Sequence, residues 1–298
     1  MFICTAYLCN DRVGIETDFS KSVYPPNMPA PLAAPATLKI ATFNIQDLWV
    51  VGRDRPARMR HIGRAIAALD PDIVGFQESF IQKDRDILIE ALDATRLRYH
   101  QYYPSATVGS GLLISSAYPI REAYFKRYTD SGPARRIWEG DFWAGKGVAL
   151  ARIETSVGMV DFYNTHAQAG YGRAEYRLVR KNQMAELAAF MNESRTGIAP
   201  AFLVGDMNSR VESEEHEAFV TGANLFRVMN MDTRIDHIYA AHNDAYEIET
   251  LDTVRIAERI TEGERTFALS DHPGYMSVVR VTPRVDEAAE TDAFSEEE

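Results

Sequence analysis

Acidic, amide and histidine side chains follow several apolar segments of this chain, at points where a strand is expected to end. Asn44 follows LKIATF, Glu78 follows DIVGFQ, Asp206 and Asn208 follow AFLVG, and His166 ends a fourth segment. Strand ends beside loops are places where a rigid scaffold presents reactive groups. Carboxylate and amide oxygens are the ligands that Mg²⁺ takes in proteins, together with waters and substrate phosphate. The pattern therefore favours magnesium chemistry at a phosphate.

The second half of the chain adds two further polar clusters. Asp236 lies in RIDHIYA, and Asp271 with His272 comes directly before the last apolar segment. Two histidines, His166 and His272, are suited to move protons and to meet negative charge at a phosphorus centre. Each residue alone has an ordinary structural interpretation, such as a turn former or a hydrogen-bonded histidine. The combination favours metal-assisted chemistry at a phosphorus centre.

Other metal and phosphate sites are disfavoured by spacing. The HExxH and Cys-rich patterns that zinc prefers are absent. Both cysteines, Cys4 and Cys9, lie in the N-terminal segment, which leaves the rest of the chain without a disulfide framework. The GKG run at Gly145–Gly147 lacks the GxxxxGK[ST] frame of a P-loop.

The elements that must position these residues are strands mixed with helices. Residues 59–69 have apolar side chains at helical spacing and end at Asp70-Pro71, and a second helix is expected to begin near Arg173. Strands are predicted over 38–43, 72–77, 111–115, 146–153, 158–164, 201–206, 236–240 and 273–281. Strands outnumber helices and no repeat is visible. We therefore expect an α+β or layered α/β domain with helices outside the sheets.

Composition divides the chain into three parts. Its 298 residues are 46% hydrophobic and 25% charged, which is typical of a globular protein. The Pro/Ala-rich residues 1–37 are expected to form a poorly ordered arm or linker, and 38–283 a single catalytic domain. Residues 284–298 are expected to form an acidic, disordered tail. The last 13 residues hold seven of the acidic side chains, so the net charge of −11 leaves −4 for the remainder.

The expected environment is aqueous. No apolar run approaches the roughly 20 residues needed to cross a bilayer, and the N-terminus has no basic region followed by an apolar core, so neither a transmembrane segment nor a signal peptide is expected. The compartment stays open: cytoplasmic is the default, and secretion is also compatible. The net-acidic body disfavours a long nucleic-acid footprint.

Five motifs, in chain order, resemble a known superfamily. ATFNIQ, GFQES, LVGDMNS, RIDHIYA and LSDHPGY look like the motif series of the endonuclease/exonuclease/phosphatase (DNase I-like) superfamily, over roughly residues 38–281. The resemblance implies a four-layered α/β sandwich, with two packed mixed β-sheets flanked by helices. It also implies the roles of the matching residues: Glu78 as principal metal ligand aided by Asn44, Asp206 and Asn208 as positioning groups for water and phosphate, Asp271 as support for the metal or histidine, and Asp236 as the residue that orients His272.

One stretch is similar to the neutral sphingomyelinases within that superfamily. GDFWAGKGVALARIE followed by VDFYNTHAQAGYGRAEYRL resembles their Lys-Gly pair and Thr-His motif, which makes His166 the second catalytic histidine. The resemblance implies phospholipase C-type release of phosphocholine from sphingomyelin or a lysophospholipid at a membrane surface. Mg²⁺ is the implied cofactor, with Mn²⁺ or Co²⁺ as substitutes. The membrane helices of the eukaryotic enzymes have no counterpart here.

Substrate contacts are predicted from residue type beside these motifs. The candidates are Lys146, Trp143, Tyr171 and Arg136, because aromatic rings suit choline and bilayer interfaces and cations suit phosphate. Their alternative role is structural, with rings in the core and charges in solvent. Two alternatives to the lipid hydrolase also remain: a nuclease or other phosphatase on the same fold, and a non-catalytic binding module. Sequence does not distinguish which histidine is the base and which the acid.

Overall fold

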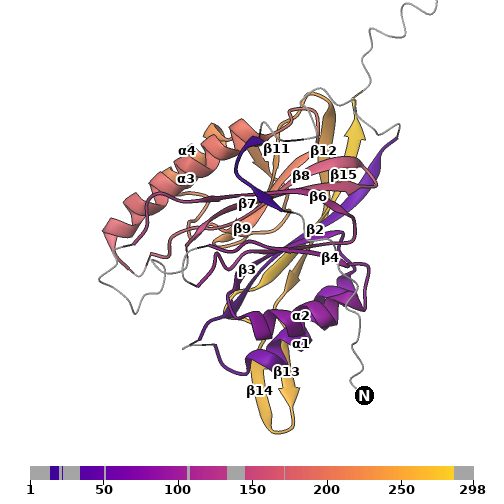
Figure 1. The fold of residues 1–298 in the computed structure, drawn as a ribbon, viewed down its shortest axis with the longest axis vertical. Helices are drawn as coiled ribbons and strands as arrows, with labels where there is room; N and C mark the ends of the chain where they lie inside the picture. The colour runs from indigo at the N-terminus through magenta and orange to yellow at the C-terminus, as the bar shows by residue number, and fades with distance from the viewer. Residues whose placement is uncertain are drawn as a thin grey trace, which may run out of the picture.

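The computed structural model describes residues 14–19, 22, 34–49, 52–105, 108–132, 145–170 and 172–284. Within these ranges two β-sheets pack face to face, and helices cover the outer face of each sheet (Figure 1). The order of layers is therefore helix, sheet, sheet, helix. This confirms the predicted four-layered α/β sandwich.

The larger sheet has seven strands and runs β1-β6-β7-β8-β9-β11-β10. Strand β8 is parallel to β9, and β9 is antiparallel to β11, so the C-terminal ends of β8 and β9 meet the N-terminal end of β11 at one edge. The strands are β1 (Ile15–Glu16), β6 (Ile120–Arg127), β7 (Gly147–Thr155), β8 (Gly158–His166), β9 (Ala201–Asp206), β10 (Leu225–Arg227) and β11 (Asp236–Ala241).

The second sheet has six strands and runs β12-β15-β2-β3-β5-β4. Its two central strands, β2 and β3, are parallel, so their C-terminal ends also lie together. A separate hairpin, β13–β14, precedes the last strand and projects beside α1 in Figure 1. The strands are β2 (Ala36–Asp47), β3 (Ile73–Ser79), β4 (Tyr99–Tyr102), β5 (Leu113–Ser116), β12 (Tyr246–Ile256), β13 (Arg259–Glu262), β14 (Arg265–Ala268) and β15 (Gly274–Pro283).

Two helices cover each sheet. Helices α1 (Arg55–Leu69) and α2 (Gln82–Asp93) lie on the six-stranded sheet, and α3 (Ala174–Ser194) and α4 (Glu214–Gly222) lie on the seven-stranded sheet. The apolar stripe predicted for α1 is buried: Met59, Ile62 and Ile66 have no exposed surface. That helix ends at Asp70, which adopts a left-handed φ of 50° before Pro71. The largest apolar cluster fills the space between the sheets.

A buried polar contact joins the two sheets beneath the site. Gln77 on β3 donates a hydrogen bond from Nε2 to Asn164 Oδ1 on β8, at 2.8 Å, and Asn164 Nδ2 donates to the carbonyls of Phe76 and Leu113. Gly75 allows this close approach, since a Cβ there would lie 2.4 Å from a methyl group of Val204. The contact fixes the position of one sheet against the other, because buried polar groups are costly to leave unpaired.

The described part of residues 1–37 packs on the body. Strand β1 pairs in parallel with β6, and β2 begins at Ala36. The ring of Phe19 lies 4.7 Å from that of Tyr124 and 5.4 Å from that of Phe190, measured between centroids. Burial of apolar surface stabilises these contacts. Residues 285–298 of the expected tail lie outside the described residues.

Candidate active site

Three site residues lie side by side at the end of the seven-stranded sheet. Asp206 at the end of β9 is in register with His166 on β8 and with Asp236 on β11. Asp206, Asp236 and His166 are 1%, 3% and 4% exposed. The parallel pairing of β8 and β9 explains why residues 40 positions apart converge, since both strands end at the same edge.

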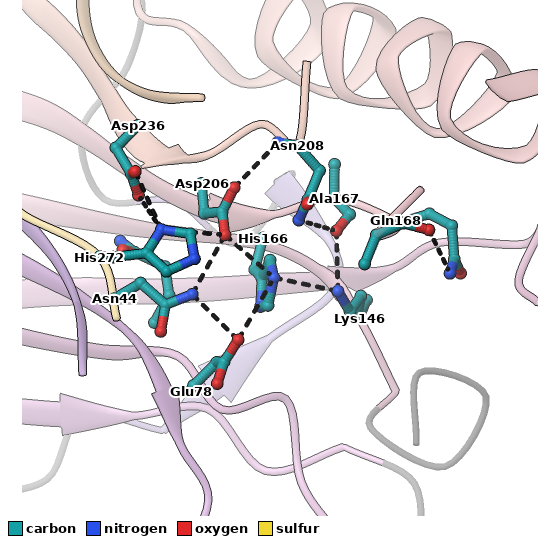
Figure 2. Close-up of polar contacts among 12 residues, drawn as sticks. Asn44, Glu78, Lys146, His166, Ala167, Gln168, Asp206, Asn208, Asp236 and His272 are labelled. Carbon is teal, nitrogen blue, oxygen red and sulfur yellow. Dashed lines mark hydrogen bonds and ion pairs between the residues drawn. The ribbon is translucent and has the colours of Figure 1, made fainter. Parts of the chain in front are cut away.

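Asn44 and Glu78 come from the six-stranded sheet. They lie at the C-terminal ends of the parallel strands β2 and β3, and face the first group across the interface between the sheets (Figure 2). Glu78 has a backbone φ of 58°, a left-handed conformation that non-glycine residues rarely adopt. Such conformations cost about 1–3 kcal/mol and concentrate at functional sites.

The side-chain amide of Asn44 links the two groups. Its Nδ2 donates to Glu78 Oε1 at 3.0 Å and to Asp206 Oδ2 at 3.1 Å, while its Oδ1 accepts the backbone N–H of Gln46 at 3.1 Å. Asn44 was expected to aid Glu78 in metal binding. In the structure its amide nitrogen holds two carboxylates from different sheets at a fixed separation.

His272 is held by Asp236. The ring Nδ1 donates to Asp236 Oδ2 at 3.0 Å, and it lies 3.8 Å from Asp206 Oδ2. Ser270 ties the same loop to β2, because its Oγ donates to the carbonyl of Asn44 at 2.7 Å and accepts the backbone N–H of His272 at 3.2 Å. The structure therefore brings His272 and Asp236 together as the resemblance implied.

His166 contacts the buried side chain of Lys146. Lys146 Nζ donates to His166 Nε2 at 3.0 Å and to the carbonyl of Ala167 at 2.7 Å. The same nitrogen of His166 lies 3.5 Å from Asp206 Oδ2 and 3.9 Å from Glu78 Oε1. Lys146 is thus part of the cluster, as Figure 2 shows.

The turn after β9 positions Asn208. The backbone N–H of Asn208 donates to Asp206 Oδ1 at 2.9 Å, and its side-chain Nδ2 donates to the carbonyl of Ala167 at 3.1 Å. Gly205 precedes this turn where β9 approaches β8, and a Cβ at that position would lie 2.1 Å from the carbonyl oxygen of Thr165. A glycine is therefore required for Asp206 to reach the site.

Burial governs the protonation of the carboxylates. It raises the pKa of Glu78 to about 7, although the hydrogen bond from Asn44 and the charge of Lys146 oppose the shift. Burial and the neighbouring Asp236 likewise raise the pKa of Asp206. Burial raises the pKa of Asp236 too, against the hydrogen bond with His272. The three carboxylates lie close together and are buried, and both conditions disfavour their charged forms.

The pKa values of the two histidines are shifted in opposite directions. Burial, together with the positive charges of Lys146 and His272, lowers the pKa of His166 well below its usual 6.5. Burial would lower the pKa of His272 as well, but the hydrogen bond with Asp236 and the charge of Asp206 raise it to about 9. In the metal-free arrangement these shifts favour a neutral His166 and a protonated His272 at neutral pH.

The donor set fits a divalent cation at Glu78. Its Oε2 is buried and has no hydrogen-bond partner among the described residues, which is unusual for a carboxylate oxygen. Asp206, Asp236 and His272 also place potential ligand atoms within 4.8 Å of one another. There, however, His272 Nδ1 already donates to Asp236. The unpartnered oxygen of Glu78 is the better match for a cation that binds through one or two carboxylates and waters.

Other predicted site residues fall outside this cluster. The side chain of Asp271 is exposed, with Oδ1 3.3 Å from Ser270 Oγ, and its charge is one of those that raise the pKa of His272. Trp143, Tyr171 and Arg136 lie outside the described residues, and their substrate contacts stay predictions. The contact of Ser270 with β2 and with the backbone of His272 was not predicted from the sequence. The position of Ser270 two residues before His272 was the available signal.

Comparison with known proteins agrees with this geometry. A family model described as the Endonuclease/Exonuclease/phosphatase family matches residues 41–272. The chain belongs to this family. The match spans every motif from Asn44 to His272, so the family resemblance is confirmed.

Several similar proteins are named as enzymes that act on sphingolipids. The chain is 30% identical to the "Putative neutral sphingomyelinase" of Drosophila melanogaster over 85% of its own length and 64% of that protein. It is 31% identical to the inositol phosphosphingolipids phospholipase C of Schizosaccharomyces pombe, over 60% and 43% of the two chains. It is 30% identical to human sphingomyelin phosphodiesterase 2, over 59% and 42%. The chain therefore spans less than two thirds of each relative.

Solved structures share the fold. The beta toxin of Staphylococcus aureus aligns with a TM-score of 0.67 at 18% identity, covering 80% of this chain and 99% of that one. Sphingomyelinase C from Streptomyces griseocarneus gives 0.62 at 18%, covering 82% and 99%. A beta toxin variant with bound magnesium ions gives 0.62 at 17%, covering 84% and 100%. Among the described helices, none has the length and apolar character to span a bilayer.

Proposed function

We propose that this protein is a Mg²⁺-dependent phosphodiester hydrolase that cleaves sphingomyelin or a lysophospholipid in the manner of a phospholipase C. One observation carries the proposal: the Asn44 amide joins Glu78 to Asp206, directly beside the His272–Asp236 pair. Glu78 would be the cation ligand, and His272 with Asp236 would handle the proton, within one cluster. The curated relatives named for sphingolipid hydrolysis support the substrate class.

Glu78 would hold the cation, with Asn44 keeping its carboxylate in place. When bound, the ion would supply positive charge that polarises a non-bridging phosphate oxygen, stabilises the leaving alkoxide and offsets the carboxylates that raise the pKa of His272. Mn²⁺ or Co²⁺ would substitute, because the ligands are oxygens. The orphaned Oε2 of Glu78 is the structural support for this assignment.

His272 would take the proton from the attacking water. Asp236 fixes the ring through Nδ1, which leaves Nε2 to accept that proton. Asp206 and Asn208 would orient the water and the phosphate. As the bond from the water oxygen to phosphorus forms, the bond from phosphorus to the lipid oxygen breaks. That oxygen takes a proton from a second water, and the hydroxide left behind is neutralised by the proton that His272 releases.

Lys146 and His166 would meet the charge on the phosphoryl oxygens. Lys146 brings a buried ammonium group to the cluster, and preorganised cations aimed at developing charge are worth several kcal/mol of barrier. His166 accepts a hydrogen bond from Lys146 and is neutral. We therefore assign it hydrogen bonding to the phosphate rather than the acid step.

A second head group has specific support. The Schizosaccharomyces pombe relative is named for inositol phosphosphingolipids and matches as closely, at 31% identity, as those named for sphingomyelin. Both head groups are joined to the lipid by the same phosphodiester. The described cluster would contact the phosphate, which is common to both, so it would suit either head group.

A parallel assay tests the proposal. The purified protein is incubated with Mg²⁺ and sphingomyelin, lysophosphatidylcholine, an inositol phosphosphingolipid or plasmid DNA, with EDTA in matched reactions. We expect a released phosphorylated head group from a lipid substrate and none with EDTA. Cleavage of DNA alone would replace the proposal with a nuclease, and cleavage of nothing would favour a binding module. Activity that persists in EDTA would contradict the metal assignment.

A further inference from the structure

Two buried histidines lie directly behind the turn that carries Asn208. His216 comes from α4 and His237 from β11, next to Asp236, and they are 1% and 0% exposed. Their ring centroids are 4.8 Å apart. Because side chains alternate along a strand, His237 points away from the face that displays Asp236 and toward α4. Neither ring belongs to the cluster described above.

Both rings bind the same residue, Ser209, which follows Asn208. His216 Nδ1 lies 2.7 Å from Ser209 Oγ, and His237 Nε2 donates to the carbonyl of Ser209 at 3.2 Å. The outer nitrogen of each ring is also fixed, His216 Nε2 by the hydroxyl of Tyr239 and His237 Nδ1 by Thr233 Oγ1 at 2.9 Å. Ser209 is therefore held at its side chain and at its backbone.

The hydrogen bonds of His216 and His237 are those of neutral imidazole rings. A carbonyl only accepts, so His237 carries its hydrogen on Nε2, and its Nδ1 accepts from Thr233. Burial lowers the pKa of His216 to about 4 and that of His237 to about 3. Each ring thus has one donor and one acceptor, and each nitrogen has a partner.

Asn208 needs this support because its backbone is in an unfavourable conformation. Its φ is 48°, in the left-handed region. On its N-terminal side, the backbone N–H of Asn208 is held by Asp206 Oδ1. On its C-terminal side, the next residue is Ser209, which the two histidines hold. Releasing Ser209 would let Asn208 relax and withdraw its side chain from the carbonyl of Ala167.

We propose that His216 and His237 are positioning residues, which clamp Ser209 and thereby hold Asn208 in the conformation the site requires. The proposal rests on the proposed function for its effect on turnover. The clamp itself is independent of the substrate. A displacement of about 1 Å at such a group costs on the order of 100-fold in rate.

Two substitutions at one position separate clamping from packing. Asparagine places an amide atom near the Nδ1 position and keeps the contact with Ser209, whereas glutamine reaches the Nε2 position and keeps the contact with Tyr239. We expect His216→Gln to lower kcat about 30-fold with KM within about twofold, and His216→Asn to lower kcat less than about threefold. Ser209→Ala should reproduce the glutamine variant. Hydrolysis of bis(p-nitrophenyl) phosphate is the readout.

Hydrogen exchange gives a readout that does not depend on activity. The amides of residues 207–209 should exchange at least about tenfold faster in His216→Gln and Ser209→Ala than in His216→Asn, at equal melting temperature. His100 is the matched control, since its Nδ1 also binds a serine hydroxyl, that of Ser115 on β5. Its Asn and Gln variants should change neither kcat nor exchange at 207–209. Equal kcat and equal exchange in the two His216 variants would overturn the clamp. A wild-type protein that cleaves no phosphodiester, but shows the exchange difference, would instead contradict the proposed function.

Discussion

His272 donates from Nδ1 to Asp236 Oδ2 at 3.0 Å, and this contact sets the charge of the ring. Replacing Asp236 by Asn keeps the shape of the side chain and removes its charge. We expect the pKa of His272 to fall from about 9 in the metal-free protein by at least one unit, because burial then dominates. Turnover should fall at least about 100-fold, since the ring loses its orienting carboxylate.

Histidine resonances in a pH titration by NMR measure this shift. Asp93→Asn is the control, because Asp93 accepts from His100 Nε2 in a similar way, away from the cluster. That variant should move the pKa of His100 and leave His272 unchanged. An Asp236→Asn protein with the wild-type His272 titration would contradict the assignment.

Glu78→Gln should separate cation binding from folding. The substitution removes the carboxylate whose Oε2 has no partner in the described part of the chain. We expect turnover to fall at least about 1000-fold and the rise in melting temperature on adding Mg²⁺ to disappear, since only a ligand that binds the folded state stabilises it. Glu90→Gln, at an exposed position on α2, should change neither quantity. A normal Mg²⁺ response in Glu78→Gln would refute its role as ligand.

The metal-free protein should lose stability as the pH rises. The folded pKa of Glu78 is about 7 against 4.5 for the free side chain, and that of His272 is about 9 against 6.5. In both windows the folded state binds more protons than the unfolded state, so these two groups lower stability as the pH rises. His166, His216 and His237, whose pKa is lowered by burial, act in the opposite direction, but only up to about the ordinary histidine value of 6.5. The melting temperature in EDTA should therefore be lower at pH 9 than at pH 7, and the gain from Mg²⁺ larger at pH 9. A melting temperature in EDTA that rises over this range would contradict the shifts.

Asn164→Ala should weaken the contact between the sheets. The change leaves the carbonyls of Phe76 and Leu113 without their side-chain donor and unpairs Gln77 Nε2 from one acceptor. We expect the free energy of unfolding to fall by about 3 kcal/mol and turnover to fall with it, because the two halves of the cluster come from different sheets. Urea denaturation measures the first quantity. Asn192→Ala, at an exposed site on α3, should cost less than about 0.5 kcal/mol.

The sequence predicted the residues of the cluster better than their contacts. Asn44, Glu78 and Asp206 were predicted because they follow apolar strands and offer the oxygen ligands that Mg²⁺ takes. Which atom of Asn44 faces the carboxylates was not predictable, since it depends on the partner sheet. The same holds for Asn164, whose place between the sheets depends on its contact with Gln77 of the other sheet.

The fold was predicted where periodicity was strong. Helix α1 and the central strands have continuous apolar patterns and were placed within a few residues. Edge elements were missed: β4 is YHQY, and the outer strand β12 alternates charged residues with apolar and threonine residues, so neither has an apolar run. The β13–β14 hairpin is charged and pairs only with itself, apart from contacts with α1 such as that between His61 and Glu262. Short polar strands are specified by their neighbours rather than by their own residues.

The hydrogen bond from Ser270 to the carbonyl of Asn44 closes a loop of chain 226 residues long. A ribosome must therefore release nearly the whole domain before the first and last members of the cluster can meet. A truncated or partly synthesised chain would contain most of the reactive side chains and still be inert. Under the proposed function, phosphodiester cleavage would thus report that the whole domain has folded.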